Sequence, residues 1–237
     1  MLRLLARGLR GIAEVLWDLL ERFVRVFHLG FSFCLGVLFA LWLTLVWFLP
    51  GAYGAEIPRE ALAHRSALVR AARAEWGLGA PVAVMAAQVH QESRWRADAV
   101  SPAGAQGLAQ FMPRTAAWLP EVAPQVGDPA PWNPGWALRA LAAYDLWLWR
   151  RVEAADDCHR WALTLSAYNG GLGWVRRDAA LARAQGLDPS HWWGQVETVN
   201  AGRGPAAWKE NRGYPRRILL HLTPLYTAAG WGQGVCP

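Results

Sequence analysis

The sequence has few cysteines, few charged residues and almost no lysine. Only three cysteines occur, and no cysteine and histidine residues have the spacing of metal ligands, which argues against a metal site. Charged residues make up 18% of the chain and Lys209 is its only lysine, so the basic stripe of a nucleic-acid binder is absent. No internal repeat and no nucleophile-elbow motif is present. These absences argue against a metalloenzyme, a nucleic-acid-binding protein, a repeat protein and a Ser-His-Asp hydrolase.

Hydrophobic residues, by contrast, make up 54% of the chain, and one segment contributes much of this excess. Residues 29–49 (LGFSFCLGVLFALWLTLVWFL) carry no charge over 21 residues, long enough for a membrane-spanning helix. Two interpretations stay open: a retained anchor, favoured by the long stretch before it, or a signal peptide cleaved near Ala55. Five arginines against three acidic residues precede the segment, so we expect a cytoplasmic N-terminus and an exported remainder.

We therefore divide the chain into a basic N-region (1–28), the hydrophobic segment (29–49), a linker (50–64) and a periplasmic domain (65–237). In an oxidising compartment, Cys158 and Cys236 can pair in a disulfide, whereas Cys34 lies within the apolar segment. From Glu56 onward the chain has 19 basic and 15 acidic residues. This balance suits an anionic partner such as cell-wall polymer, and equally an ordinary solvated surface.

Helical patterns dominate after the linker, and no run shows the alternation of a strand. Pro113 and the proline-rich stretch 120–134 are expected to lie in loops, with Thr115 as a helix cap. The exported part is therefore predicted to be a single, mainly α domain. The expected helices cover residues 60–76, 81–94, a segment starting at 115, 136–152, 160–168, 172–184, 190–199 and 215–227.

The helix expected at 81–94 carries the strongest candidate for chemistry. Val82, Met85 and Val89 form an apolar stripe, and Glu92 is the next position on it. A carboxyl group that continues a buried face has a raised pKa and can hold a proton near neutral pH, as a general acid must. The alternative is that Glu92 lies at the helix end and reaches solvent or Arg96.

Three sequence blocks resemble the soluble lytic transglycosylase (SLT) family, a branch of the lysozyme-like superfamily. They are ES at 92–93 followed by SPAGAQGLAQFMPRTA at 101–116, NP at 133–134, and AYNGG at 167–171. Ala109 stands where the family usually has methionine. ENRGY at 210–214 is a weaker match, because Pro215 departs from the pattern and is expected to break or restart the helix. The resemblance covers roughly residues 65–227, and the export segment and compact size are similar to transglycosylases encoded with conjugative-transfer systems.

The resemblance implies a lysozyme-like fold and cleavage of peptidoglycan by one carboxyl group, without metal or cofactor. Glu92 would protonate the glycosidic oxygen between MurNAc and GlcNAc. It would then accept the proton of the MurNAc C6 hydroxyl as that oxygen attacks the anomeric carbon, giving a 1,6-anhydro sugar. Gly104 and Gly107 would let the backbone approach the glycan closely. The substrate-binding residues implied are Ser101, which would hydrogen-bond near Glu92, together with Gln110, Tyr168, Asn169, Glu210 and Tyr214.

Two other functions stay open at this point. A hydrolytic muramidase needs a second carboxylate, about 5–5.5 Å or about 6.5–9.5 Å from the acid, for which Asp98 and Glu210 are candidates. A non-catalytic peptidoglycan-binding scaffold of a secretion or conjugation assembly is the other, and the presence of Glu92 argues against it. Expected partners are glycan strands, such an assembly and, if the segment 29–49 is uncleaved, the inner membrane, but not nucleic acid. The tryptophans considered for a glycan groove are Trp132, Trp136, Trp192 and Trp193.

Overall fold

The computed structural model describes residues 56–237, and the predicted N-region and hydrophobic segment lie outside this range. Residues 55–237 form one compact unit, built in the described range from helices and loops without a β-strand. No helix within residues 56–237 is long and apolar enough to cross a membrane. The elements are α2 (Arg59–Trp76), α3 (Val82–Ser93), α4 (Pro113–Val122), η1 (Pro124–Val126), α5 (Pro134–Trp149), α6 (Asp157–Gly170), α7 (Leu172–Ala184), η2 (Val196–Thr198), α8 (Pro205–Arg216), η3 (Arg217–Leu222) and α9 (Thr223–Ala228).

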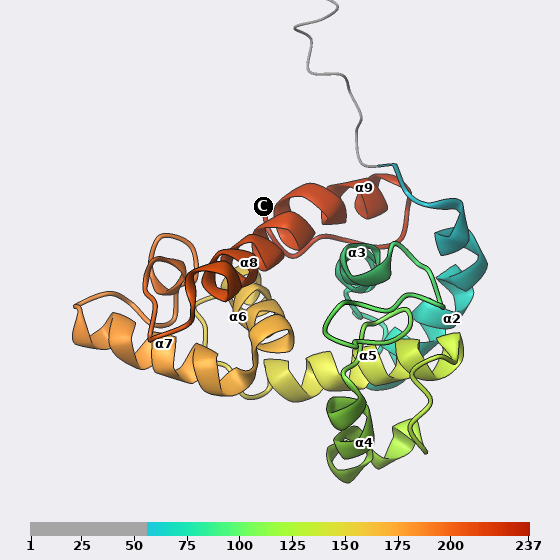
Figure 1. Ribbon diagram of the computed structural model, residues 1–237. Coiled ribbons are helices and arrows are strands. Elements are labelled where there is room, and N and C mark those ends of the chain that lie inside the picture. Colours follow the sequence, from blue (N-terminus) through green and yellow to red (C-terminus); the bar gives the residue numbers. More distant parts are fainter. Residues whose placement is uncertain (1–55) are drawn as a thin grey trace, which may run out of the picture. The chain divides into compact units, whose positions relative to one another are not determined.

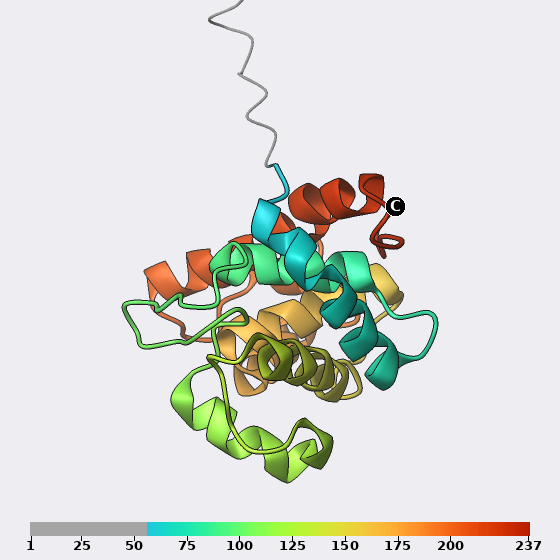
Figure 2. The ribbon, with the colours of Figure 1, turned by 90° about the vertical axis from the view of Figure 1, so that its right-hand side faces the viewer.

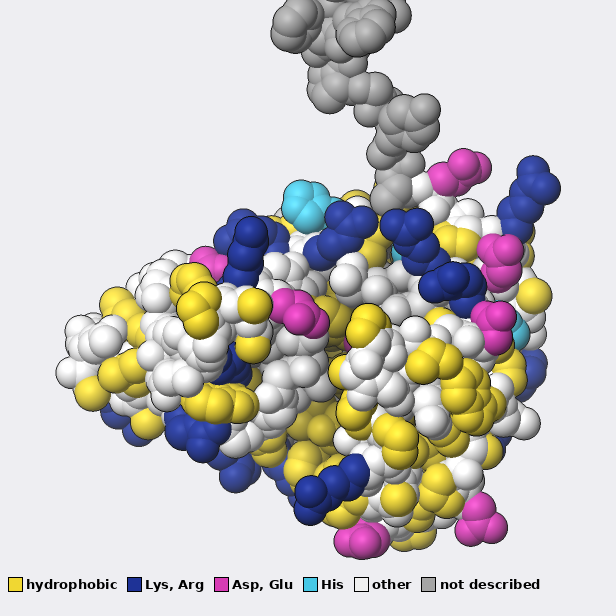
Figure 3. Space-filling model, in the orientation of Figure 1, with side chains coloured by type: hydrophobic (Ala, Val, Ile, Leu, Met, Phe, Trp, Pro, Cys, Tyr) yellow, Lys and Arg dark blue, Asp and Glu magenta, His cyan; other side chains and the backbone are white. Residues whose placement is uncertain are grey.

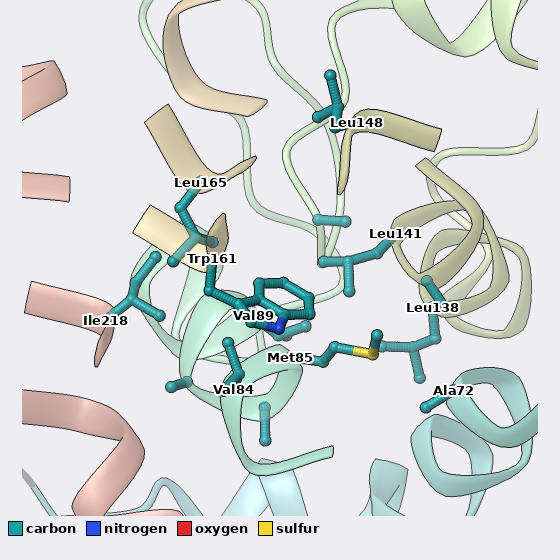
Figure 4. Packing of buried hydrophobic residues seen from close by; sticks show 14 of the residues in the cluster. Ala72, Val84, Met85, Val89, Leu138, Leu141, Leu148, Trp161, Leu165 and Ile218 are labelled. Atoms are coloured by element: carbon teal, nitrogen blue, oxygen red, sulfur yellow. The ribbon is translucent and has the colours of Figure 1, made fainter. Parts of the chain in front are cut away.

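Helix α3 is the centre of the domain, and every residue from Val82 to His90 is buried. A helix that is apolar on all sides must be enclosed by other helices, and α2, η3 and α9 pack directly on it. Side chains of α5 and α6, among them Leu141 and Trp161, complete the core around Met85 (Figure 4). In both ribbon views α5 lies between α4 on one side and the consecutive helices α8, η3 and α9 on the other (Figure 1, Figure 2).

Local sequence signals explain where several helices begin and end. The side chain of Asn133 caps α5 by accepting the Trp136 N–H at 3.0 Å, and Asp156 caps α6 in the same way. Gly171 ends α6 with a φ of 94°, a conformation that glycine adopts without strain. Helix α2 begins at Arg59 and buries Ala61.

The structure overturns three helix predictions. Pro113 begins α4 instead of preceding a helix capped by Thr115, because the first turn of a helix needs no N–H from proline. Pro120 lies inside α4 rather than in a loop. The helix expected at 190–199 is a loop with only the short turn η2, and Gly194 interrupts it with a φ of 70°.

The prediction that Pro215 breaks the last helix was also wrong. Pro215 lies within α8, and the chain continues without interruption through η3 into α9. Directly after the proline, η3 takes the wider π-helical form, in which the Thr223 N–H donates to the carbonyl oxygen of Ile218. The proline ring crowds the turn before it, which η3 does not include, so α8 continues through Pro215 with one backbone hydrogen bond fewer.

The C-terminal tail returns to the body of the domain. Cys158 in the first turn of α6 and Cys236 in the tail form a disulfide, with sulfur atoms 2.01 Å apart. Trp231, in the same tail, is buried against Tyr226 and Trp95. The tail therefore covers part of the core rather than extending into solvent.

Candidate active site

A groove of about 800 Å³ runs between α3 with its following loop and the face formed by α6 and α8. It is seen as a hollow in the face of the molecule in Figure 3. Every residue expected to act in catalysis or binding lines it: Glu92, Ser101, Gln110, Tyr168, Asn169, Glu210 and Tyr214. The chain thus brings together residues that lie far apart in the sequence.

Glu92 lies in the last turn of α3, and its carboxyl group meets the hydroxyl of Tyr214, which donates a hydrogen bond to Oε1. The pKa of Glu92 is raised to about 8, because burial and, to a smaller extent, the charge of Glu210 raise it more than the Tyr214 hydrogen bond lowers it. The carboxyl group is therefore protonated at neutral pH. A neutral acid facing a groove is what proton donation to a substrate requires.

The end of α3 is held in a conformation that few side chains adopt. Arg94 and Trp95 have φ values of 53° and 65°, in the left-handed region, which costs about 1 kcal/mol or more per residue. Trp95 is buried, and its Nε1–H donates to the hydroxyl of Tyr226 at 2.7 Å. This burial offsets the backbone cost of the two positive φ values.

The loop after α3 is held by its own side chains. Ser101 Oγ accepts the Ala105 N–H at 3.0 Å, a hydrogen bond within the loop. Gln110, with a φ of 50°, donates through Nε2 to the carbonyl oxygens of Ala99 and Gly107 at 3.0 and 2.8 Å. Ser101 and Gln110 therefore shape the groove by fixing the loop that lines it.

Gly104 and Gly107, the two glycines of the loop after α3, differ in whether a side chain would fit at their positions. At Gly107, where φ is 73°, a Cβ atom would lie 1.9 Å from the carbonyl oxygen of Pro131. Gly107 is thus required for the close approach of the 131–132 backbone, not of a glycan. Gly104 has a φ of 87° and nothing within 4 Å of its Cβ position, so its contribution is the turn alone.

The AYNGG block, residues 167–171 at the end of α6, forms hydrogen bonds both with the loop after α3 and with α8. The Tyr168 hydroxyl donates to the carbonyl oxygen of Ala109 at 2.7 Å. Asn169 accepts a hydrogen bond from Asn211 at 3.0 Å and donates one to Glu210 at 3.4 Å. These contacts bring the end of α6, the loop and α8 together on one side of the groove.

Helix α8 is fixed by a buried charge cluster that the sequence did not reveal. Asp178 of α7 is fully buried and pairs with Arg203 and with Arg212, whose Nη2 lies 2.9 Å from Asp178 Oδ2. Arg212 also donates to the carbonyl oxygens of Glu197 and Val199. Because Tyr214 follows two residues later, this cluster sets the position of its hydroxyl at Glu92. The only sequence signal was an aspartate within an otherwise alanine-rich helix.

A second buried carboxyl group, also missed, lies behind the groove. Asp145 of α5 is fully buried, and Gln88 Nε2 donates to its Oδ1 at 3.2 Å. Burial, and then the charge of Glu92, hold the pKa of Asp145 well above its usual range. Gln88 lies one turn before Glu92 on α3, and this spacing was the available signal. Among the described residues, no group of three or more His, Cys, Asp or Glu side chains could hold a metal ion.

The remaining candidates, two carboxylates and four tryptophans, differ in whether they line the groove. Asp98 is exposed in a turn and is not part of the groove lining, whereas Glu210 is. Trp136 and Trp192 are buried in the core and are therefore not part of a glycan groove. Trp132 is 46% exposed, but neither it nor Trp193 lines the groove.

Comparison with known proteins gives a consistent result. Residues 70–192 match the family model described as "Transglycosylase SLT domain". Membrane-bound lytic murein transglycosylase F of Shewanella halifaxensis is 38% identical over 109 residues, which are 46% of this chain and 22% of that protein. Its counterpart from Maricaulis maris is 33% identical over 144 residues, 60% of this chain and 29% of that protein. This chain thus spans only about a quarter of the length of these relatives.

Solved structures agree on the fold. The lytic transglycosylase Slt of Pseudomonas aeruginosa matches with a TM-score of 0.51 and 25% identity, over 76% of this chain and 26% of that one. The 70 kDa soluble lytic transglycosylase of Escherichia coli matches with a TM-score of 0.51 and 22% identity, over 72% of this chain and 25% of that one. The domain therefore has the mainly α, lysozyme-like fold that was predicted. With more than half of its residues matched by the family model, the chain belongs to the transglycosylase SLT domain family.

Proposed function

We propose that this protein is a peptidoglycan lytic transglycosylase in which Glu92 is both the general acid and the general base. The observation that carries the proposal is the carboxyl group of Glu92, which faces the groove, has a pKa of about 8 and accepts a hydrogen bond from Tyr214. The family match and the lytic transglycosylase names of the relatives support the same activity.

The reaction needs one proton donor that then becomes a proton acceptor. Glu92 donates its proton to the glycosidic oxygen between MurNAc and GlcNAc as that bond breaks, and becomes a carboxylate. The carboxylate then takes the proton of the MurNAc C6 hydroxyl while this oxygen bonds to the anomeric carbon. A 1,6-anhydro ring forms, Glu92 regains its proton and no water is consumed, so the nucleophile is already in place within the substrate.

The surrounding residues would stabilise the ionised intermediate state of Glu92. The Tyr214 hydroxyl donates to the carboxyl group, and a hydrogen bond to an ionised acceptor is stronger than one to a neutral acceptor. Tyr168 and Gln110 hold the loop at the groove through their hydrogen bonds to backbone carbonyl groups. We assign Ser101, Gln110, Tyr168, Asn169 and Glu210 to the shaping of the substrate site.

Hydrolysis is the second candidate, because Glu210 lines the same groove and its charge acts on Glu92. A muramidase would use this carboxylate to activate water or to attack the sugar. The hydrogen bond that Glu210 accepts from Asn169 favours a positioning role instead. The two reactions differ in their products, which makes them separable.

We place the reaction in the periplasm, with export directed by residues 29–49. Whether that segment is then cleaved near Ala55 or kept as an inner-membrane anchor decides between a released and a tethered enzyme. Local wall opening for a secretion or conjugation assembly remains our hypothesis for its purpose.

Incubation of purified sacculi with the full chain, beside a Glu92→Gln variant, tests the activity. The wild-type protein should release soluble muropeptides, and the folded variant should release at least about a hundredfold less, the usual contribution of a general acid. Equal release by both proteins would contradict the role of Glu92. No release by the folded wild-type protein would favour a non-catalytic wall-binding function.

A further inference from the structure

One wall of the groove is a single face of helix α8 and its π-helical continuation. Its members recur at intervals of three or four residues, the spacing of one helix face: Ala206, Lys209, Glu210, Gly213, Tyr214 and Arg217. Lys209 and Arg217 lie on either side of Tyr214, which contacts Glu92. The wall therefore presents a cation to each side of the reacting carboxyl group.

These two cations differ from their neighbours in having no anionic partner. Arg203 and Arg212 pair with Asp178, and Arg216 Nη2 lies 3.1 Å from Glu197 Oε2. Lys209 and Arg217 are exposed and form no ion pair within residues 56–237. Arg217 donates only through Nε, to the side-chain oxygen of Gln91 at 3.1 Å.

Glu210 is the anion on the same wall, and it forms no ion pair with either cation within residues 56–237. It accepts a hydrogen bond from Asn169 Nδ2 at 3.4 Å, at the end of α6. The wall thus carries two unpaired positive charges and one negative charge. Eight residues of helix separate the two cations, about 12 Å along the axis, so a single carboxylate does not reach both.

We propose that Lys209 and Arg217 bind carboxylate groups of the peptidoglycan strand on either side of the bond that Glu92 cleaves. This inference rests on the proposed function and extends it to the choice of substrate. Strands present such groups in two ways: on their stem peptides, or on the lactyl group of MurNAc once the peptide has been removed. Either carboxylate accepts charge-assisted hydrogen bonds from ammonium and guanidinium groups.

The two cations act on binding rather than on bond cleavage, because they contact groups that do not react. Loss of such a contact raises KM and leaves kcat unchanged. The attraction between exposed charges also weakens as salt increases, so that the preference for charged strands falls with ionic strength.

The test combines charge removal on the protein with charge removal on the substrate. The full-length wild-type chain, Lys209→Met and Arg217→Met act on three substrates: peptide-bearing strands, amidase-treated strands, and strands whose carboxylates are coupled to methylamine. Arg216→Met is the matched control, since it removes a cation from the same helix outside the groove. Thermal unfolding verifies that each variant folds.

We expect each groove substitution to raise KM for carboxylate-bearing strands about fivefold and to leave kcat unchanged. With methylamidated strands the variants should match the wild-type protein, and Arg216→Met should match it throughout. An effect on amidase-treated strands identifies the lactyl carboxylate, and an effect only on peptide-bearing strands identifies the stem peptide. The same KM change on charged and amidated strands, or no change on either, would overturn the proposal.

Binding of the Glu92→Gln protein separates this proposal from the catalytic one. Its retention on insoluble strands is measured by sedimentation, with and without Lys209→Met or Arg217→Met, and needs no cleavage. Weaker retention of the double variants on charged strands supports the carboxylate sites even if the wild-type protein cleaves nothing. Unchanged retention refutes these sites even if the wild-type protein is an active transglycosylase.

Discussion

The hydroxyl of Tyr214 donates a hydrogen bond to the carboxyl group of Glu92, although 122 residues separate the two in the sequence. Glu92 ends the central helix of the core, and Tyr214 lies in α8, which the Asp178 cluster fixes from behind. This contact joins the two walls of the groove at the point where the chemistry is proposed. It also opposes the effect of burial on the pKa of Glu92.

Replacing Tyr214 with phenylalanine should therefore change the acidity of Glu92. Without this hydrogen bond the pKa of Glu92 rises further, because the contact favours the ionised form. The alkaline limb of the pH–rate profile should move to higher pH, and kcat should fall about tenfold, since a hydrogen bond to an ionised group contributes about 1.5–3 kcal/mol. The measurement is kcat against pH for both proteins.

Tyr226→Phe is the matched control for this prediction. It removes the same hydroxyl from a buried tyrosine that bonds to Trp95 outside the groove. We expect it to lower stability by about 1–2 kcal/mol without moving the pH profile. A Tyr214→Phe profile that coincides with the wild-type profile would contradict a contact that tunes Glu92.

Stability should depend on pH through Glu92 in a direction opposite to that of a salt-bridged acid. The carboxyl group has a pKa near 4.5 in the unfolded chain and about 8 in the folded protein. Between these values the folded state holds the additional proton, so raising the pH from 4.5 through 8 progressively destabilises it. Glu92→Gln removes this effect and should be about 4 kcal/mol more stable than the wild-type protein at pH 8, with little difference at pH 4.5.

Urea unfolding at several pH values measures this difference. The exposed Glu121 supplies a control, because Glu121→Gln removes a carboxyl group in contact with solvent and should change stability little at any pH. A stability difference between Glu92→Gln and wild type that shrinks as pH rises would show that the folded protein keeps Glu92 ionised.

The Cys158–Cys236 disulfide should contribute stability but no catalysis. It closes a loop with a sequence separation of 78, for which chain entropy predicts a contribution of about 4.5 kcal/mol. Cys158 lies at the start of α6 and the groove residues Tyr168 and Asn169 at its end, roughly 15 Å along the helix. The double substitution by serine should lower the denaturation midpoint and keep kcat. A loss of activity while the protein is still folded would contradict this separation.

Gly107→Ala should disrupt the groove loop far more than Gly104→Ala. Both positions have positive φ, but only at Gly107 would a Cβ atom collide with the Pro131 carbonyl oxygen. We expect Gly107→Ala to lose about 2–4 kcal/mol and much of the activity, and Gly104→Ala to lose about 1 kcal/mol. Thermal unfolding and release from sacculi measure both. Equal effects of the two changes would contradict the packing of residues 131–132 on this loop.

The sequence predicted most of the helices and the place of Glu92 on a buried helix, because both depend on local signals. The apolar face of α3 with Glu92 near its end and the glycine stop after α6 are readable from neighbouring residues. The predictions made from the positions of proline were wrong at two places. Pro113 begins a helix although it was expected in a loop, and Pro215 lies inside a helix that it was expected to break or restart.

What could not be predicted depends on contacts between distant segments. Asp178 meets Arg203 and Arg212 only once α7 and α8 pack together, and without that cluster nothing indicates that Tyr214 reaches Glu92. Asp145 looked like an ordinary polar residue of α5, yet it is fully buried against Gln88. The burial of Trp136 and Trp192 has the same origin, since only tertiary packing decides which aromatic rings enter the core.

Mass spectrometry of the muropeptides released from purified peptidoglycan, with Glu92→Gln as control, tests the central claim most directly. The account predicts 1,6-anhydroMurNAc ends, one water lighter than reducing ends, that are absent from the control digest. Reducing ends from the wild-type protein would contradict it, because they mean that water, and not the C6 hydroxyl, attacked the anomeric carbon.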